Sequence, residues 1–101
     1  MQEKSVNLWR QNLGVLPATL WENTALETLM LADNQLTELP PAIAALTSLR
    51  TLDLGHNLLT ELPESLSLLT ALTDYLYLHD NKLTALRESL FVRMIRLRYL
   101  N

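Results

Sequence analysis

Hydrophobic positions recur along this chain at an interval much longer than the period of a helix or a strand. Residues 26–49 read LETLMLADNQLTELPPAIAALTSL and residues 49–72 read LRTLDLGHNLLTELPESLSLLTAL, so the leucine and proline positions repeat after 23 residues. Each unit follows LxxLxLxxNxLxxLPxxLxxL. A partial earlier unit reads VNLWRQNLGVLPATL, and a later unit reads LYLHDNKLTALRESLFVRMIRL. A repeat of this length indicates a stack of similar units, each of which buries its apolar face against its neighbours.

The pattern within one unit predicts a short strand followed by a turn. Leu52 and Leu54 alternate with Asp53, so the two leucines point inward and the carboxylate points outward. Asn57 follows where the chain must turn, and its amide can hydrogen-bond to backbone groups of the neighbouring unit. We predict that the residues at this position form a polar ladder through the stack: Gln11, Asn34, Asn57 and Asn81.

The second half of each unit predicts a return segment on the opposite side. Pro40 and Pro63 stop strand pairing because proline lacks a backbone N–H. Apolar residues lie three apart in residues 43–46 and 66–69, which predicts a turn of α- or 3-10 helix.

This pattern resembles the leucine-rich repeat signature over residues 6–101. The Leu-Pro pair and the 23-residue length are similar to Ras-group-related, plant intracellular and plant-like bacterial leucine-rich repeat proteins. The resemblance implies an α/β repeat fold. This implied fold is a curved right-handed solenoid with a parallel sheet on the concave side and short helical or 3-10 turns and loops on the convex side. We expect one domain over residues 1–101 with about four repeats, at roughly 5–25, 26–48, 49–71 and 72–96, and a partial unit at 97–101.

The period changes after Asn57, and the ends of the chain are uncapped. The interval from Asn57 to Asn81 is 24 residues, and we expect the additional residue, Asp74 or Tyr75, to form a small bulge entering the strand. Neither end carries a polar capping unit, so we interpret the chain as a fragment or short end of a longer solenoid.

Composition narrows the function classes. The 101 residues include 27 leucines and no cysteine, which removes disulfides, thiol nucleophiles and cysteine-bound zinc. The net charge of −3 argues against a dedicated nucleic-acid-binding protein. The first ten residues do not have the apolar core expected of a signal peptide, and no apolar run approaches the roughly 18–20 residues that a membrane span requires. These features predict a cytoplasmic protein and leave a secreted effector open.

The side chains between the inward leucines should stand in rows on the concave face, where neighbouring strands lie about 4.8 Å apart. Tyrosine is enriched at binding hot spots because it combines a large rigid surface with a polar tip. Cross-strand packing of Tyr75 on Tyr99 is the structural alternative. We predict that the following residues contact a partner: Met30, Asp33, Asp53, His56, Tyr75, Tyr77, His79, Asp80 and Tyr99.

Few residues of the sequence are candidates for catalysis or for metal binding. In the row formed by Asp33, His56 and Asp80, two carboxylates flank an imidazole, which suggests either loose metal binding or an exposed charge ladder. The expected exposure favours the charge ladder, so we predict no catalytic residue, no metal and no cofactor. The basic segment with Arg93, Arg96 and Arg98 is expected on the outer face, and we predict no nucleic-acid partner. The two glycines do not form a phosphate-binding loop, and the chain is not expected to be an enzyme.

The sequence therefore predicts a protein–protein interaction module that serves scaffolding or signalling through its concave face. The family resemblance implies small GTPase pathways or immune-type ligands as partners. One alternative is the substrate-recognition arm of a larger enzyme, a kinase or a ubiquitin ligase. Another is a structural stack that self-associates through its uncapped ends.

Overall fold

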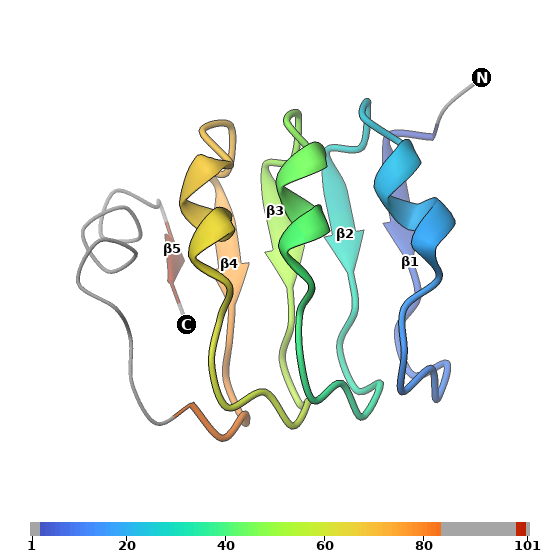
Figure 1. Cartoon of the computed structure of the whole chain (residues 1–101). Helices are drawn as coiled ribbons and strands as arrows, with labels where there is room; N and C mark the ends of the chain where they lie inside the picture. Colours follow the sequence, from blue (N-terminus) through green and yellow to red (C-terminus); the bar gives the residue numbers. More distant parts are fainter. Residues whose placement is uncertain (1–2, 84–98, 101) are drawn as a thin grey trace.

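The computed structural model describes residues 3–83 and 99–100, which follow a solenoid path (Figure 1). Successive strands lie side by side in one parallel sheet, in chain order. The order follows the chain because each turn of the solenoid returns the backbone to the edge of the sheet it has just left. The strands are β1 (Ser5–Asn7), β2 (Thr28–Met30), β3 (Thr51–Asp53), β4 (Tyr75–Tyr77) and β5 (Tyr99–Leu100).

The strands pair in the register that the repeat predicts. The central residues Leu29, Leu52 and Leu76 stand opposite one another and are fully buried. The side chains before and after them therefore point to the solvent side of the sheet, which we call the sheet face. The first residues of the strands stand opposite one another in this register: Ser5, Thr28, Thr51, Tyr75 and Tyr99.

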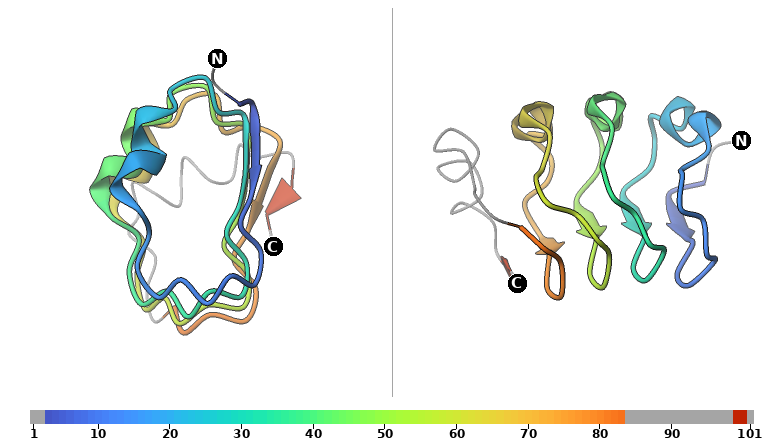
Figure 2. Two further views of the ribbon diagram at one scale, coloured as in Figure 1. Left: turned by 90° about the vertical axis from the view of Figure 1, so that its right-hand side faces the viewer. Right: turned by 60° about the horizontal axis from the view of Figure 1, so that its bottom comes forward.

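Within residues 3–83, three 3-10 helices cover the opposite side of the solenoid, as the return segments predict (Figure 2). Proline precedes each helix as its N-cap residue, with φ between −70° and −67°. The ring fixes φ near these values, so the chain is set to enter the helix. No described helix is long and apolar enough to cross a membrane. The helices are η1 (Ala18–Glu22), η2 (Pro41–Ala45) and η3 (Glu64–Leu68).

Leucines fill the space between the sheet and the helices as one continuous core. Each turn contributes equivalent positions, so the side chain of Leu52 lies in the same column as Leu29 and Leu76. A leucine that is fully removed from water stabilises the fold by about 1.5–3 kcal/mol. Because the core runs across the turns, each unit depends on its neighbours for this burial.

The additional residue of the 24-residue interval lies before the strand, and the expected bulge at Asp74 or Tyr75 is wrong. The carbonyl of Arg50 accepts from the backbone N–H groups of Asp74 and Tyr75, at 3.2 and 3.4 Å. The carbonyl of Glu27 accepts from Arg50 and Thr51 in the same way. Asp74 thus takes the place of Arg50, and the additional residue is Thr73, which is exposed. An exposed loop accommodates it without breaking the strand pairing.

Candidate binding face of the sheet

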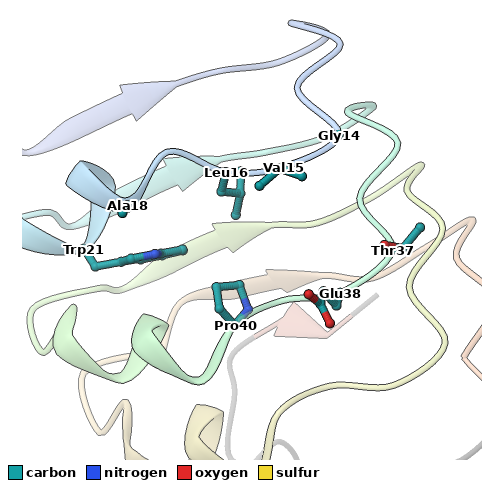
Figure 3. Close-up of a pocket in the computed structure, with 8 residues that line it drawn as sticks. All are labelled: Gly14, Val15, Leu16, Ala18, Trp21, Thr37, Glu38 and Pro40. Carbon is teal, nitrogen blue, oxygen red and sulfur yellow. The ribbon is translucent and has the colours of Figure 1, made fainter.

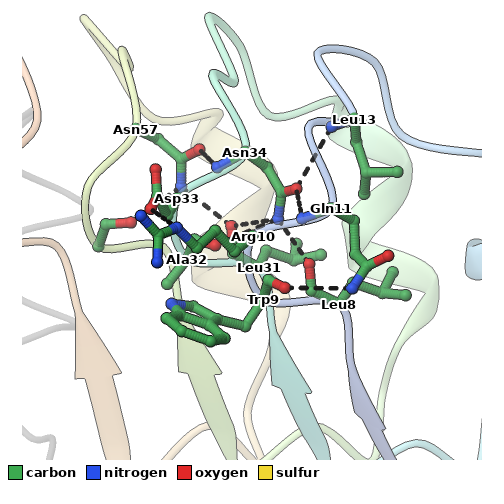
Figure 4. A network of polar contacts seen from close by, with 11 residues as sticks. Leu8, Trp9, Arg10, Gln11, Leu13, Leu31, Ala32, Asp33, Asn34 and Asn57 are labelled. Atoms are coloured by element: carbon green, nitrogen blue, oxygen red, sulfur yellow. Dashed lines mark hydrogen bonds and ion pairs between the residues drawn. The ribbon is translucent and has the colours of Figure 1, made fainter.

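A column of asparagines joins the turns where the strands end (Figure 4). The side-chain oxygen of Asn34 accepts from the backbone N–H groups of Gln11 and Leu13, at 2.9 and 3.3 Å. Both donors belong to the preceding turn. The side-chain nitrogen of Asn34 donates to three carbonyls, those of Leu8, Leu31 and Ala32. One amide therefore satisfies backbone groups of two turns.

Asn57 repeats this arrangement one turn later, and Asn81 continues it. The oxygen of Asn57 accepts from the N–H groups of Asn34 and Leu36, at 3.0 and 3.1 Å. Asn34 and Asn57 are buried. Gln11 differs, because its exposed side chain donates only to the carbonyl of Trp9, two residues earlier. Gln11 joins the column through its backbone N–H alone.

The residue just before each ladder position adopts a left-handed backbone conformation. Arg10, Asp33, His56 and Asp80 have φ of 58°, 59°, 53° and 57°. For a residue with a side chain, this conformation costs roughly 1–2 kcal/mol. The repetition shows that the turn after each strand requires this geometry.

These four side chains form two pairs. The guanidinium of Arg10 lies 3.3 Å from the carboxylate of Asp33, measured between Nε and Oδ2. The imidazole Nδ1 of His56 lies 3.2 Å from Oδ2 of Asp80. Asp33 and Asp80 flank His56 in the sequence pattern, but Asp33 pairs with Arg10. Such solvent-accessible pairs typically contribute about 0–1 kcal/mol.

Four aromatic rings form a continuous cluster at β4 and the adjacent turns. The rings of Tyr75 and Tyr77 are stacked, with centroids 5.9 Å apart and planes within 4°. Tyr77 meets His79 edge-to-face at 6.3 Å, and His79 meets His56 edge-to-face at 4.8 Å. Tyr75 is 38% exposed. We call these four residues the aromatic strip.

Comparison with known proteins identifies the repeat. A family model described as leucine-rich repeats in two copies matches residues 24–73. The structure is similar to that of a leucine-rich repeat protein from Leptospira interrogans, with a TM-score of 0.80 and 27% sequence identity over 97% of this chain. The chain has the leucine-rich repeat fold. It spans 30% of the Leptospira protein's length. No curated protein matches the chain in sequence.

Leucine-rich repeat domains are generally protein-interaction modules that use an extended surface of the solenoid. The predicted subtype, which includes Ras-group-related and plant-like proteins, stays a prediction. The predicted partner-contacting residues on the strands also include Met30, Asp53 and Tyr99. Met30 is half-buried opposite Asp53, and Asp53 stands opposite Tyr77. Tyr99 pairs with Tyr75 through the backbone, and the predicted ring packing lies outside the described side chains.

A small hollow between the first two leucine-rich repeats was not predicted from the sequence (Figure 3). Its volume is about 230 Å³, below the about 300–1,000 Å³ of typical small-molecule sites. Glu38 is its one charged lining residue. Stacking brings its lining together from distant segments, so no local sequence motif marks it. The lining residues are Gly14, Val15, Leu16, Ala18, Trp21, Thr37, Glu38 and Pro40.

Proposed function

We propose that this leucine-rich repeat protein binds a protein partner through its sheet face, in a scaffolding or signalling role that involves no catalysis by the chain. One observation supports this function more than any other. The aromatic strip of Tyr75, Tyr77, His79 and His56 lies on the solvent side of a sheet whose other side is packed with leucine. Tyrosine residues in such positions carry much of the binding energy in protein interfaces.

The strip is well suited to binding because its shape is fixed before a partner arrives. Tyr75 and Tyr77 project from the same strand, and their rings are stacked against each other. A tyrosine has only two side-chain torsions, so ordering it on binding loses little conformational entropy. The strip therefore supports affinity without a large ordering penalty.

Charge favours a partner with a basic surface. Residues 1–86 carry four basic against ten acidic side chains, a net charge of −6. Asp53 stands opposite Tyr77 in the sheet, and Asp80 follows His79 in the chain. A lysine or arginine of the partner would gain from these carboxylates and from the faces of the tyrosine rings.

Site-specific photo-crosslinking tests which face binds. A photoreactive phenylalanine analogue is placed at Tyr77 in one protein and at Leu68 in a matched control. Leu68 lies in η3 on the opposite side and is 65% exposed. We expect a discrete crosslinked partner from position 77 and none from position 68.

The affinity for that partner is then measured with alanine variants. We expect Tyr77→Ala to weaken binding about thirtyfold or more, because hot-spot truncations cost roughly 2 kcal/mol or more. Leu68→Ala should bind as the wild type does. Equal crosslinking from both faces, or an unchanged affinity of a folded Tyr77→Ala protein, would contradict the proposal.

A second candidate function is the recognition arm of a larger enzyme, such as a kinase or a ubiquitin ligase. It is favoured by the comparison, since the similar Leptospira protein is more than three times as long as the part this chain matches. The intact mass of the native protein, detected with an antibody to this segment, distinguishes the two. A mass near 11.5 kDa supports the stand-alone module, and a much larger mass supports the arm.

A further inference from the structure

We propose that His56, His79 and Asp80 form a binding site for one divalent transition-metal ion, with zinc as the fitting ion. The proposal goes beyond partner binding and does not depend on it. One ligand-type atom from each of the three residues lies within 4.8 Å of the others. Two imidazoles and one carboxylate from two neighbouring turns thus meet at one edge of the sheet face.

The separation of two of these atoms already suits zinc. Nδ1 of His56 lies 3.2 Å from Oδ2 of Asp80. In a tetrahedral zinc site with bonds of about 2.0–2.2 Å, two ligand atoms lie about 3.3–3.6 Å apart. The nitrogen of His79 is at most 4.8 Å from the other two atoms. A shift of at most about 1.2–1.5 Å brings it to the same separation.

The backbone holds the three residues in place. His56 and Asp80 occupy equivalent left-handed positions of successive turns, with φ of 53° and 57°. The N–H of His56 donates to the carbonyl of His79 at 2.9 Å. The ladder residue Asn81, next to Asp80, accepts from the preceding turn. The fold therefore sets the backbone positions of the three ligands, which leaves only side-chain torsions to be ordered when a metal binds.

His79 has unused capacity to coordinate. Its Nδ1 is buried and has no hydrogen-bond partner among the described residues. Buried imidazole nitrogens are normally satisfied, so this one calls for an explanation. A neutral imidazole carries one nitrogen with a free lone pair, and this is the form that binds metals. A cation bound at Nδ1 would give His79 the polar partner that the described residues do not supply.

The donor set selects the kind of ion. Calcium and magnesium prefer oxygen ligands, whereas zinc binds imidazole and carboxylate together. Sites with two histidines and one carboxylate usually leave a fourth position to water. The chain contains no cysteine, so a thiolate site does not compete for the metal.

Metal titration of the full chain tests the proposal. Zinc binding is followed by calorimetry, and cobalt binding is followed by its visible absorption, which is intense for tetrahedral coordination. Magnesium serves as the oxygen-seeking control. We expect one zinc per chain, an intense cobalt spectrum and no binding of magnesium.

Three variants remove one ligand each. His56→Asn and Asp80→Asn keep a residue that tolerates the left-handed backbone, and His79→Phe keeps a flat ring. Each should weaken zinc binding at least about tenfold. Asp33→Asn is the matched control, because Asp33 has the same backbone conformation and pairs with Arg10 outside the cluster.

The result that would overturn the proposal is equally specific. No zinc binding by the wild type, or equal binding by the wild type and the three ligand variants, shows that the cluster does not bind the metal. Unfolding curves recorded without metal establish that each variant is folded. Tyr77→Ala should bind zinc like the wild type, so failure of the metal site is distinguished from failure of partner binding.

Discussion

The Cβ atom that Gly55 lacks would lie 2.7 Å from Cε1 and 2.8 Å from Nε2 of His79. The imidazole of His79 thus occupies the space that a side chain at position 55 would need. Gly55 is not in the left-handed region of φ, in contrast to Gly14. The glycine is therefore explained by the room it gives to a ring of the aromatic strip.

Gly55→Ala should displace the His79 ring. Inserting a methyl group into a packed site costs about 1–3 kcal/mol, and we expect the lower end because an imidazole can rotate away. In a double-mutant cycle with His79→Ala, most of this cost should disappear, because the alanine at 79 no longer meets the new methyl group. Urea unfolding of the four proteins measures the coupling. Strictly additive free energies of unfolding would show that the two residues do not compete for space.

Asn57→Ala should be among the most destabilising polar substitutions in the chain. The carbonyls of Leu31 and Leu54 keep donors from Asn34 and Asn81, but the buried N–H groups of Asn34 and Leu36 lose their acceptor. Each unsatisfied buried group costs about 1–3 kcal/mol, so we expect a loss of about 2–6 kcal/mol. Chemical denaturation measures it.

Gln11→Ala is the matched control from the same column. Its exposed amide makes one long hydrogen bond, to the carbonyl of Trp9 at 3.3 Å. We expect a change of at most about 0.5 kcal/mol in the free energy of unfolding. Equal losses at positions 11 and 57 would mean that the buried ladder bonds contribute no more than surface bonds.

His56→Val should destabilise the fold more than His56→Asn. With φ of 53°, position 56 disfavours a β-branched residue, whereas asparagine tolerates the left-handed region. We expect a difference of about 1–2 kcal/mol, measured as thermal stability without metal. Thr60→Val is the control, since Thr60 is exposed and outside the left-handed set. A similar effect at both positions would contradict the backbone explanation.

Binding of the protein partner should weaken as salt is raised. The Debye length falls from about 10 Å at 0.1 M salt to about 3 Å at 1 M, which screens the acidic surface from a basic partner. Asp53→Asn should reduce this salt dependence while its side-chain oxygen still accepts from the N–H of Gly55. Tyr77→Ala should lower affinity without changing the salt dependence. A salt-independent affinity of the wild type would remove the basic-partner hypothesis.

The repeat architecture was predictable because one side-chain class specifies it. Inward positions such as Leu52 accept little besides a large apolar residue, so the period of leucine reports the period of the backbone. Asn57 was also predictable as a residue of the turn, since few side chains combine donors and acceptors at that size. Both features depend on constraints that recur in every unit.

The details of the sheet face depend on contacts that do not recur. Arg10 pairs with Asp33, and this pairing follows from side-chain rotamers that the sequence does not report. The His79 ring fills the space beside Gly55. These residues are 24 positions apart and occupy the same position in successive repeats, but one is a glycine and the other a histidine. The prediction of a bulge was wrong for a similar reason. The sequence does not show whether Thr73, Asp74 or Tyr75 is the additional residue.

Because Thr73 is an additional residue in an exposed loop before β4, it is a suitable position for attaching a label. The carbonyl of Arg50 accepts hydrogen bonds from the backbone N–H groups of Asp74 and Tyr75. These bonds fix the sheet register at residues that follow the loop. Since the chain has no cysteine, Thr73→Cys would give a single attachment point for a fluorophore. The label would sit beside β4, near enough to sense occupancy of the sheet face, and outside the rows that make it.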